Sequence, residues 1–263
     1  MALKIENGQI VGTIDNLEEK LEGKLPVTRE ELLVLANSWG RKLDFEAKAS
    51  NNQMLMIDKC DSKECYDLSK LDTSEITDMS SIFRTSNFNG DISNWNTSNI
   101  TNMEWMFFKA EKFNSDISNW DTSNVTSMER MFSFAINFNQ SVNFDTSKVI
   151  SMLSMFYSAE KFNQPLNFDT SNVTDMSYMF RNTKSFNQAL NFNTSNVKKM
   201  ERIFAYSENF NQPLNNWDVS KVTNMAGMFE SSIFNQDLNN WNTDSLINIG
   251  HLFAFAENFN QPI

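Results

Sequence analysis

The sequence has very few of the residues that metal centres, disulfide scaffolds and glycine-rich loops require. Its 263 residues include 1 histidine, 2 cysteines, 4 prolines and 7 glycines. Zinc sites need about four nitrogen, sulfur or carboxylate ligands, and calcium-binding β-rolls need glycine-rich repeats. Neither a phosphate-binding glycine loop nor a Ser–His–Asp set can be assembled. We therefore expect no metal, no cofactor and no enzymatic activity.

Long apolar runs and an excess of positive charge are also missing. No stretch approaches the roughly 18 apolar residues of a transmembrane helix, so no membrane insertion is expected. The net charge of −11 repels nucleic acids and anionic membranes, so nucleic acid is not expected as a partner. Residues 1–20 contain no uninterrupted apolar segment of the signal-peptide type. The expectation is either a cytoplasmic chain or one whose signal has been removed.

What the sequence has in abundance is repetition. The clearest copy of the repeat runs from Asp169 to Phe192. Its first position recurs every 24 or 25 residues, at Asp72, Asn96, Asp121, Asp145, Asp169, Asn193, Asp218 and Asn242. Such a period predicts a solenoid, in which each copy is one coil that contacts its neighbours. Residues 67–263 are expected to form eight repeats, the last incomplete.

Each repeat contains a pattern typical of a short helix. In the copy that begins at Asp121, apolar residues recur at i, i+3, i+4 and i+7, namely Met128, Met131, Phe132 and Ala135. This spacing places them on one face of a helix of about two turns. Thr126 and Glu129 have capping-box spacing, as do Thr101 and Glu104.

A second pattern in each repeat is typical of a short strand. Leu166 to Phe168 alternates apolar, polar and apolar residues, and stacked copies predict a parallel sheet. Four copies carry one extra residue and a tryptophan, which predicts β-bulges that turn the indoles inward; the bulges would lie at Asn94, Asn119, Asn216 and Asn240. The predicted fold is an α/β repeat solenoid, leucine-rich-repeat-like, with short parallel strands on one face and short helices on the other. Its interior should stack Phe107, Phe132, Phe156 and Phe180 on one another.

An asparagine follows a phenylalanine at the same place in every repeat. The eight members are Asn89, Asn114, Asn139, Asn163, Asn187, Asn211, Asn235 and Asn260. An amide side chain has both a donor and an acceptor, so it can continue a hydrogen-bonded ladder from coil to coil. The alternative is a solvated turn residue. We interpret these asparagines as a structural ladder, because a solvated residue would not be needed in all eight copies.

Residues 1–66 differ from the repeats and predict a small α+β cap. Lys4 to Ile14 is expected to form a hairpin, Thr28 to Glu31 has capping-box spacing before a helix closed by Gly40, and Met54 to Ile57 can be a strand. A cap would cover the apolar end of the first coil; a separate binding or catalytic domain is the alternative. Cys60 and Cys65 are two ordinary thiols, one local disulfide or, less favoured, part of a metal site.

One column of the repeat varies although its neighbours do not. It lies two residues after the first methionine of the predicted helix: Ser81, Trp105, Arg130, Ser154, Tyr178, Arg202, Gly227 and His251. Trp105, Arg130, Tyr178 and Arg202 are of the types that anchor protein interfaces. We expect them to form an exposed binding column; neutral variation on a solvated face is the alternative.

The repeat string Phe-Asn-Gln-x-Leu-Asn-x-Trp-Asp-Thr-Ser-x-Val-Thr-x-Met-x-x-Met-Phe resembles the roughly 25-residue repeat of BspA-like leucine-rich-repeat surface proteins of bacteria. The resemblance covers residues 67–263. It implies a solenoid on the cell surface or secreted from the cell, used for adhesion or protein recognition, without catalytic activity. The alternatives are an intracellular protein-binding solenoid, such as a scaffold or toxin-neutralising protein, and an enzyme with its site in residues 1–66.

The last repeat stops in mid-coil at Ile263 without a polar cap. An uncapped end exposes apolar surface and unpaired backbone groups. Either the native chain continues, or this end associates with another molecule. End-to-end self-association is therefore a further expectation, beside a protein partner.

Overall fold

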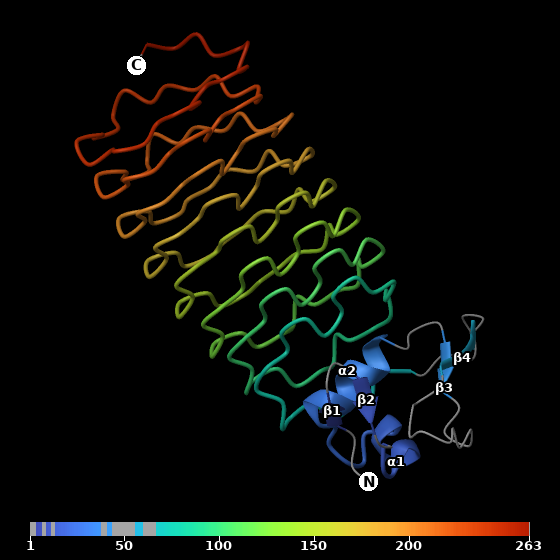
Figure 1. The fold of residues 1–263 in the computed structure, drawn as a ribbon. Helices are drawn as coiled ribbons and strands as arrows, with labels where there is room; N and C mark the ends of the chain where they lie inside the picture. Colours follow the sequence, from blue (N-terminus) through green and yellow to red (C-terminus); the bar gives the residue numbers. More distant parts are fainter. Residues whose placement is uncertain are drawn as a thin grey trace.

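Short elements precede the repeats in the computed structural model, which describes residues 4–6, 9–11, 14–37, 41–43, 56–59 and 67–262 (Figure 1). Strand β1 (Lys4–Glu6) pairs antiparallel with β2 (Gln9–Val11), which confirms the predicted hairpin. Strand β3 (Arg41–Leu43) pairs antiparallel with β4 (Met56–Lys59), which overlaps the second predicted strand. The helices are α1 (Leu17–Leu21) and α2 (Arg29–Asn37).

Helix α2 begins with the predicted capping box. The Thr28 N–H donates to Glu31 Oε2 at 2.9 Å, and the Glu31 N–H donates to Thr28 Oγ1 at 3.3 Å. The reciprocal bonds satisfy two backbone donors that the first helical turn leaves free. Leu32, Leu35 and Ala36 are fully buried and belong to the same core as the repeats. Gly40 lies outside the described residues.

The segment around α2 contacts the first coil of the repeats. The Val27 N–H donates to the Asp72 carbonyl at 3.0 Å. The Arg29 guanidinium donates to the carbonyls of Asp78 and Ser80 at 3.1 and 2.8 Å. These bonds cover backbone groups of the first coil that have no earlier coil to pair with. That residues 1–66 as a whole are a cap stays a prediction.

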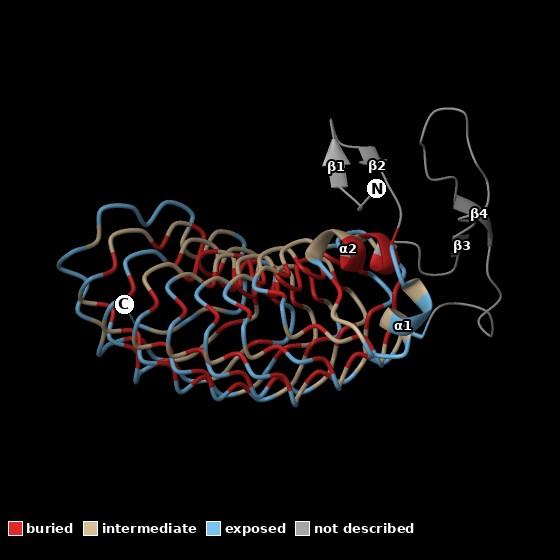
Figure 2. Cartoon of the chain, turned by 90° about the horizontal axis from the view of Figure 1, so that it is seen from below, coloured by how far each residue is buried: buried red, intermediate tan, exposed pale blue. Residues whose placement is uncertain are grey.

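The repeats form a row of coils, each lying against the next (Figure 1). Isolated parallel bridges join equivalent residues of successive coils, in the order Asp78, Asn102, Ser127, Ser151, Asp175, Lys199, Asn224 and Asn248. Buried residues of successive coils line up along the interior (Figure 2). The period of 24 or 25 residues therefore corresponds to one coil.

Phenylalanine columns fill the interior of the row. The rings of Phe107, Phe132, Phe156 and Phe180 stack in that order, with centroids 5.5–5.8 Å apart and planes within 9° of parallel. All four side chains are fully buried. A second column runs beside the first, and Phe113 lies 3.8 Å from Phe107 between ring centroids. The expected stack of Phe107, Phe132, Phe156 and Phe180 is confirmed.

The predicted α/β solenoid with short parallel strands and short helices is wrong. Residues 67–262 contain isolated bridges, turns and irregular backbone, but no helix and no strand. The described helices and strands all lie in the N-terminal part of the chain. The leucine-rich-repeat-like sheet is therefore absent from these residues.

Left-handed backbone at two places in every coil explains why the predicted helices do not form. Trp105 and Lys109 have φ of 58° and 56°, whereas an α-helix needs φ near about −60° throughout. Every second N–H from Met103 to Lys109 donates to a carbonyl of the next coil at 2.8–3.0 Å, not to the carbonyl four residues back. The predicted apolar face is nevertheless buried, since Met103, Met106, Phe107 and Ala110 have no exposed surface.

The predicted capping boxes inside the repeats do not form either. The Thr101 and Thr126 hydroxyls donate to carbonyls of the preceding coil, each at 3.2 Å. The Glu104 N–H donates to the side chain of Asn102 at 2.9 Å instead. The threonine hydroxyls therefore bond to the neighbouring coil and do not cap a helix of their own coil.

The tryptophans of the four longer repeats point inward without a β-bulge. Trp95 has a backbone turn bond to Ile92 at 3.2 Å, and the extra residue of these copies lies within that turn. Since no sheet is present there, the bulges predicted at Asn94, Asn119, Asn216 and Asn240 do not exist. Each indole N–H donates to a carbonyl of the preceding coil at 2.8–3.3 Å, in Trp95, Trp120, Trp217 and Trp241. A buried indole needs such an acceptor.

The eight asparagines lie along an uninterrupted series of hydrogen bonds. The side-chain oxygen of each accepts the backbone N–H of the next asparagine, at 2.7–3.0 Å, through all seven intervals from Asn89 to Asn260. A glutamine after the asparagine often donates to the same oxygen, as Gln188 does to Asn163 at 3.0 Å. The asparagine oxygens thus join backbone to backbone across the coils.

The Asp-Thr-Ser turn bonds both within and between coils. Asp169 Oδ1 accepts the Ser171 N–H at 2.9 Å, which closes the local turn. The buried Thr170 hydroxyl donates to the Asn193 carbonyl of the next coil at 3.0 Å. The serine hydroxyl and N–H hold the pKa of the carboxyl below its ordinary value at Asp121, Asp145, Asp169 and Asp218.

Removing one asparagine oxygen should destabilise the repeats. Asn163→Ala leaves the Asn187 N–H without its acceptor, and we expect a loss of about 1–3 kcal/mol in the free energy of unfolding. Asn163→Asp keeps an acceptor oxygen and should lose less. Urea unfolding followed by circular dichroism measures both. The exposed Asn167→Ala is the control, with a change below about 0.5 kcal/mol; equal losses in all three variants would contradict the ladder.

The repeats should lose stability in acid. A carboxyl with a lowered folded pKa contributes stability that is present above its unfolded pKa and is lost as the pH falls through the folded value, here below about pH 4. The variant with asparagine at Asp121, Asp145, Asp169 and Asp218 keeps the acceptor but does not titrate, as Asn96 and Asn193 do not. Thermal midpoints between about pH 2.5 and 7 should fall less in this variant; equal slopes would show that these carboxyls are not responsible.

Candidate binding site

The variable column has one backbone conformation in all eight coils. Its residues all lie in the left-handed region, with φ between 48° and 61°: Ser81, Trp105, Arg130, Ser154, Tyr178, Arg202, Gly227 and His251. Two members, Ser154 and Gly227, are buried, and the four expected binding residues are half-buried instead of fully exposed. The conformation is set by the bonds between coils, so the side chain at this position is free to vary.

Two further columns share this surface. One lies three residues after the variable column and includes Arg84, Phe108 and Tyr157. The other lies four residues after it, is again left-handed in every coil and includes Lys109 and Phe134. We name this surface the aromatic–arginine face and define it by Arg84, Trp105, Phe108, Lys109, Arg130, Phe134, Tyr157, Tyr178, Arg181, Arg202 and Tyr206.

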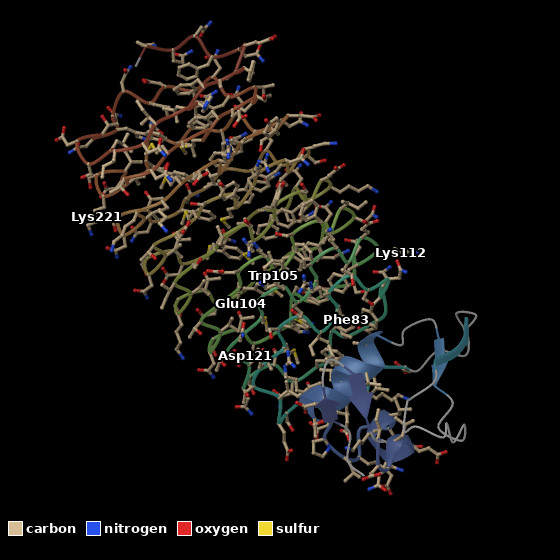
Figure 3. All side chains as sticks on the ribbon, in the orientation of Figure 1. Phe83, Glu104, Trp105, Lys112, Asp121 and Lys221 are labelled. Atoms are coloured by element: carbon tan, nitrogen blue, oxygen red, sulfur yellow. The ribbon has the colours of Figure 1, made fainter. Side chains whose placement is uncertain are left out.

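Cations and rings alternate on the aromatic–arginine face around Trp105, which is labelled in Figure 3. The Arg130 guanidinium carbon lies 4.4 Å from the centroid of the Trp105 ring, and that of Arg84 lies 5.0 Å from it. Phe108 contacts the same ring at 4.7 Å between centroids. Arginine over tryptophan is a favourable cation–π arrangement, so these contacts hold the half-buried indole in place.

The contacts continue through the next coils. Phe134 lies 5.7 Å from Phe108 and 4.7 Å from Tyr157 between ring centroids. The Arg181 guanidinium lies 5.1 Å from the Tyr157 ring and 5.2 Å from the Tyr206 ring. Its Nη1 also donates to the Tyr157 hydroxyl at 2.6 Å. From Arg84 to Tyr206, side chains from six coils therefore form one connected surface.

A pocket of about 350 Å³ opens on this face. Its lining consists of Trp105, Phe108, Arg130, Ser133, Phe134, Ser154, Tyr157, Tyr178 and Arg181. Ser133 lies in a column that has Phe108 and Tyr157 in the adjacent coils, and Ser154 lies between Arg130 and Tyr178 in the variable column. Two small side chains among large ones create the hollow.

The structure brings three of the four expected binding residues together. Trp105, Arg130 and Tyr178 line the pocket, whereas Arg202 does not. Arg202 Nε instead donates to Glu230 Oε2 at 3.1 Å. Gly227 leaves room for this pair, because a Cβ at Gly227 would lie 2.9 Å from Arg202 Cγ.

Phe108, Phe134, Tyr157 and Arg181 also line the pocket, although the sequence does not single them out. They lie three or four residues after members of the variable column, and their own columns vary in the same way. That shared variation is the signal that could have identified them. The predicted helix would also have placed them on the side of the variable column, because residues three and four apart on a helix lie on one face.

Carboxylates gather beside the pocket without lining it. The Tyr178 hydroxyl donates to Glu201, and the Tyr206 hydroxyl donates to Glu230 at 2.8 Å. Burial, together with the neighbouring Glu201 carboxylate, raises the pKa of Tyr178, so the phenol is neutral. Burial alone would raise the pKa of Glu230, but the hydrogen bonds from Tyr206 and Arg202 outweigh it and hold that pKa below its ordinary value.

Cys60 and Cys65 lie outside the described residues, so the possible disulfide stays a prediction. His251 is exposed in the last coil. Within the described ranges, no three or more His, Cys, Asp or Glu side chains lie close enough together to hold a metal ion. Among the helices that the structure describes, none has the length and apolar character to cross a membrane.

The last coil exposes apolar side chains. Ile249 is 55% exposed, whereas Met225, the equivalent residue one coil earlier, is 1% exposed. Ile247 and Phe255 are more exposed still, at 85% and 79%. End-to-end self-association through this coil stays a prediction.

Comparison with known proteins places the repeats in a family. The family described as Mycoplasma protein of unknown function, DUF285, matches residues 51–167, 118–206 and 166–263. The family is related in general to the BspA-like proteins, but the BspA-like family itself gave no match. No curated protein and no solved structure matched the chain. Because the three overlapping matches together cover residues 51–263, the chain belongs to the DUF285 family of repeat proteins.

Proposed function

We propose that the chain is a non-enzymatic protein-recognition module that binds its partner through the aromatic–arginine face. The observation that supports this most is the pocket in which Trp105, Arg130 and Tyr178 meet. A few residues carry most of the binding energy in protein interfaces, and these residues are enriched in tryptophan, tyrosine and arginine and cluster in well-packed pockets. Their presence in one connected surface is more than neutral variation requires.

The rigidity of the surface also supports recognition. The residues of the variable column are bonded through backbone to the next coil, as the Trp105 N–H is to Glu129 at 2.9 Å. The rings are packed on one another before any partner arrives. A surface that is already ordered loses little conformational entropy when it binds.

The composition of the pocket favours binding over catalysis. Its side-chain polar groups are guanidinium, phenol, indole and serine hydroxyl groups. The Ser133 hydroxyl is already a donor to the Ser154 carbonyl. A nucleophilic serine needs a base within hydrogen-bond reach, and no base lines this pocket. An adhesion module on the cell surface or in a secreted protein is the setting that the BspA-like resemblance favours; an intracellular scaffold is the alternative.

Removing two anchors should abolish capture of the partner. Immobilised wild-type chain and Trp105→Ala plus Tyr178→Ala would be incubated with the same cell-surface protein extract, and captured proteins quantified by mass spectrometry. Each anchor is expected to contribute about 2 kcal/mol, which is roughly 30-fold in affinity. Proteins captured by the wild type should therefore be lost.

The control is Ile150→Ala, which removes a 56% exposed apolar side chain from a different column. Its capture should match the wild type. Circular dichroism and the thermal midpoint establish that each variant is folded. Unchanged capture by the folded double variant would overturn the proposed face.

A further inference from the structure

We infer that the pocket binds an acidic side chain of a peptide, with an apolar or aromatic residue next to it. The inference rests on the proposed function and adds the chemical class of the ligand. The charged groups in the lining are both guanidinium groups, those of Arg130 and Arg181, and the lining contains no carboxylate and no side-chain amide. A guanidinium group has hydrogen-bond donors and no acceptor. A ligand that supplies hydrogen-bond acceptors therefore fits this pocket best.

Both arginines retain unused donors. Arg202 and Arg29 pair with carboxylates, but within the described part of the chain no carboxylate pairs with Arg130. Arg181 Nε is buried and has no hydrogen-bond partner among the described residues, so a ligand would meet this guanidinium through its Nη atoms, of which Nη1 already donates to Tyr157. A buried donor without an acceptor is unfavourable. A ligand carboxylate provides acceptor oxygens and the opposite charge, and arginine binds carboxylates in a bidentate geometry.

The walls of the pocket suit the remainder of a peptide side chain. Trp105, Phe108 and Phe134 present rings, against which the methylene groups of glutamate and a neighbouring aromatic ring can pack. The volume of about 350 Å³ lies at the lower end for small-ligand pockets, and it accommodates one or two side chains. The site therefore fits a short motif of an extended segment.

Charge distribution directs such a motif to this face. The chain carries a net charge of −11, so most of its surface repels an acidic peptide. Arg84, Lys109, Arg130 and Arg181 make the aromatic–arginine face a local exception. The neighbouring carboxylates of Glu201 and Glu230 are each paired with Arg202. Clusters of one sign of charge attract and orient oppositely charged ligands.

A peptide fits the lining better than a glycan does. Sugar hydroxyls donate as well as accept, and the lining offers them only serine and tyrosine oxygens, with no carboxylate or side-chain amide to accept from several hydroxyls at once. An acidic glycan could still supply a carboxylate. The test therefore includes an oligosaccharide that carries glucuronate.

The test titrates the whole chain with two pentapeptides, acetylated and amidated, of sequence Gly-Phe-Glu-Phe-Gly and Gly-Phe-Gln-Phe-Gly, by isothermal calorimetry. The glutamate peptide should bind with Kd near or below about 1 mM and the glutamine peptide at least about tenfold more weakly. Higher salt should lower the affinity of the chain for the glutamate peptide. Equal affinities, no saturable binding of the glutamate peptide, or tighter binding of a hyaluronan tetrasaccharide would each overturn the inference.

Two kinds of variant locate the binding. Arg130→Gln plus Arg181→Gln should weaken binding of the glutamate peptide by about tenfold or more, whereas Lys112→Gln, an exposed cation outside the pocket and the aromatic–arginine face, should change it less than about twofold. Ser154→Tyr should close the pocket with both arginines intact, in a backbone conformation that Tyr178 already adopts. Ser81→Tyr is its control in the same column. Binding unchanged by Ser154→Tyr would place the peptide elsewhere.

The outcomes separate the ligand class from the proposed function. Capture that depends on Trp105 and Tyr178, with no preference for the glutamate peptide, would overturn the ligand class alone. Capture that is unaffected by the loss of both anchors would overturn the proposed function itself. If the double arginine variant does not fold, Ser154→Tyr and its control still decide the result.

Discussion

The structure of the repeats depends on backbone groups that pair with the next coil in preference to their own. From Met103 to Lys109 every second N–H donates to the following coil. This alternation requires two left-handed residues per coil, each of which costs about 1–2 kcal/mol for a residue other than glycine. The neighbouring coil offsets that cost by satisfying the exposed donors and by covering the phenylalanine columns. No single coil has either benefit alone.

Side chains, like the backbone groups, form hydrogen bonds between adjacent coils. The asparagine oxygens, the threonine hydroxyls and the indole N–H groups all bond to backbone of an adjacent coil, as Asn139, Thr146 and Trp120 do. Polar groups inside a protein must be paired, and here the pairs lie across the coil boundary. The Asp-Thr-Ser turn adds a local bond at each corner, which fixes where one coil ends and the next begins.

The sequence predicts burial well and backbone conformation poorly. Met103, Met106 and Phe107 are buried as their spacing requires, and the phenylalanines stack in register. A spacing of three and four residues does not distinguish a helix from a coil with turn bonds three residues back, because both direct these side chains inward. Nothing in residues such as Trp105 and Lys109 marks them as left-handed, since glycine is the usual signal. The capping box at Thr28 and Glu31, in contrast, depends on local chemistry alone and was predictable.

The sequence likewise predicts some residues of the candidate site but not the hollow that they surround. Variation singled out Trp105, Arg130 and Tyr178, but the hollow between them depends on Ser133 and Ser154, whose importance lies in being small. Arg202 is of a residue type that anchors interfaces, but its guanidinium already donates a hydrogen bond to Glu230. Residue type indicates which side chains are suited to contact a ligand. Which of them are free to do so depends on their neighbours in the adjacent coils.

The left-handed column has a consequence for how such chains diversify. Tryptophan, arginine, serine, tyrosine, glycine and histidine all occupy it with nearly the same φ. Replacing one by another therefore keeps the bonds between coils wherever the new side chain has room, which it lacks at Gly227. The side chains of this column vary, whereas its backbone conformation is constant. Under the proposed function, exchange of single residues or whole coils would change the partner while the backbone of the repeats stays the same.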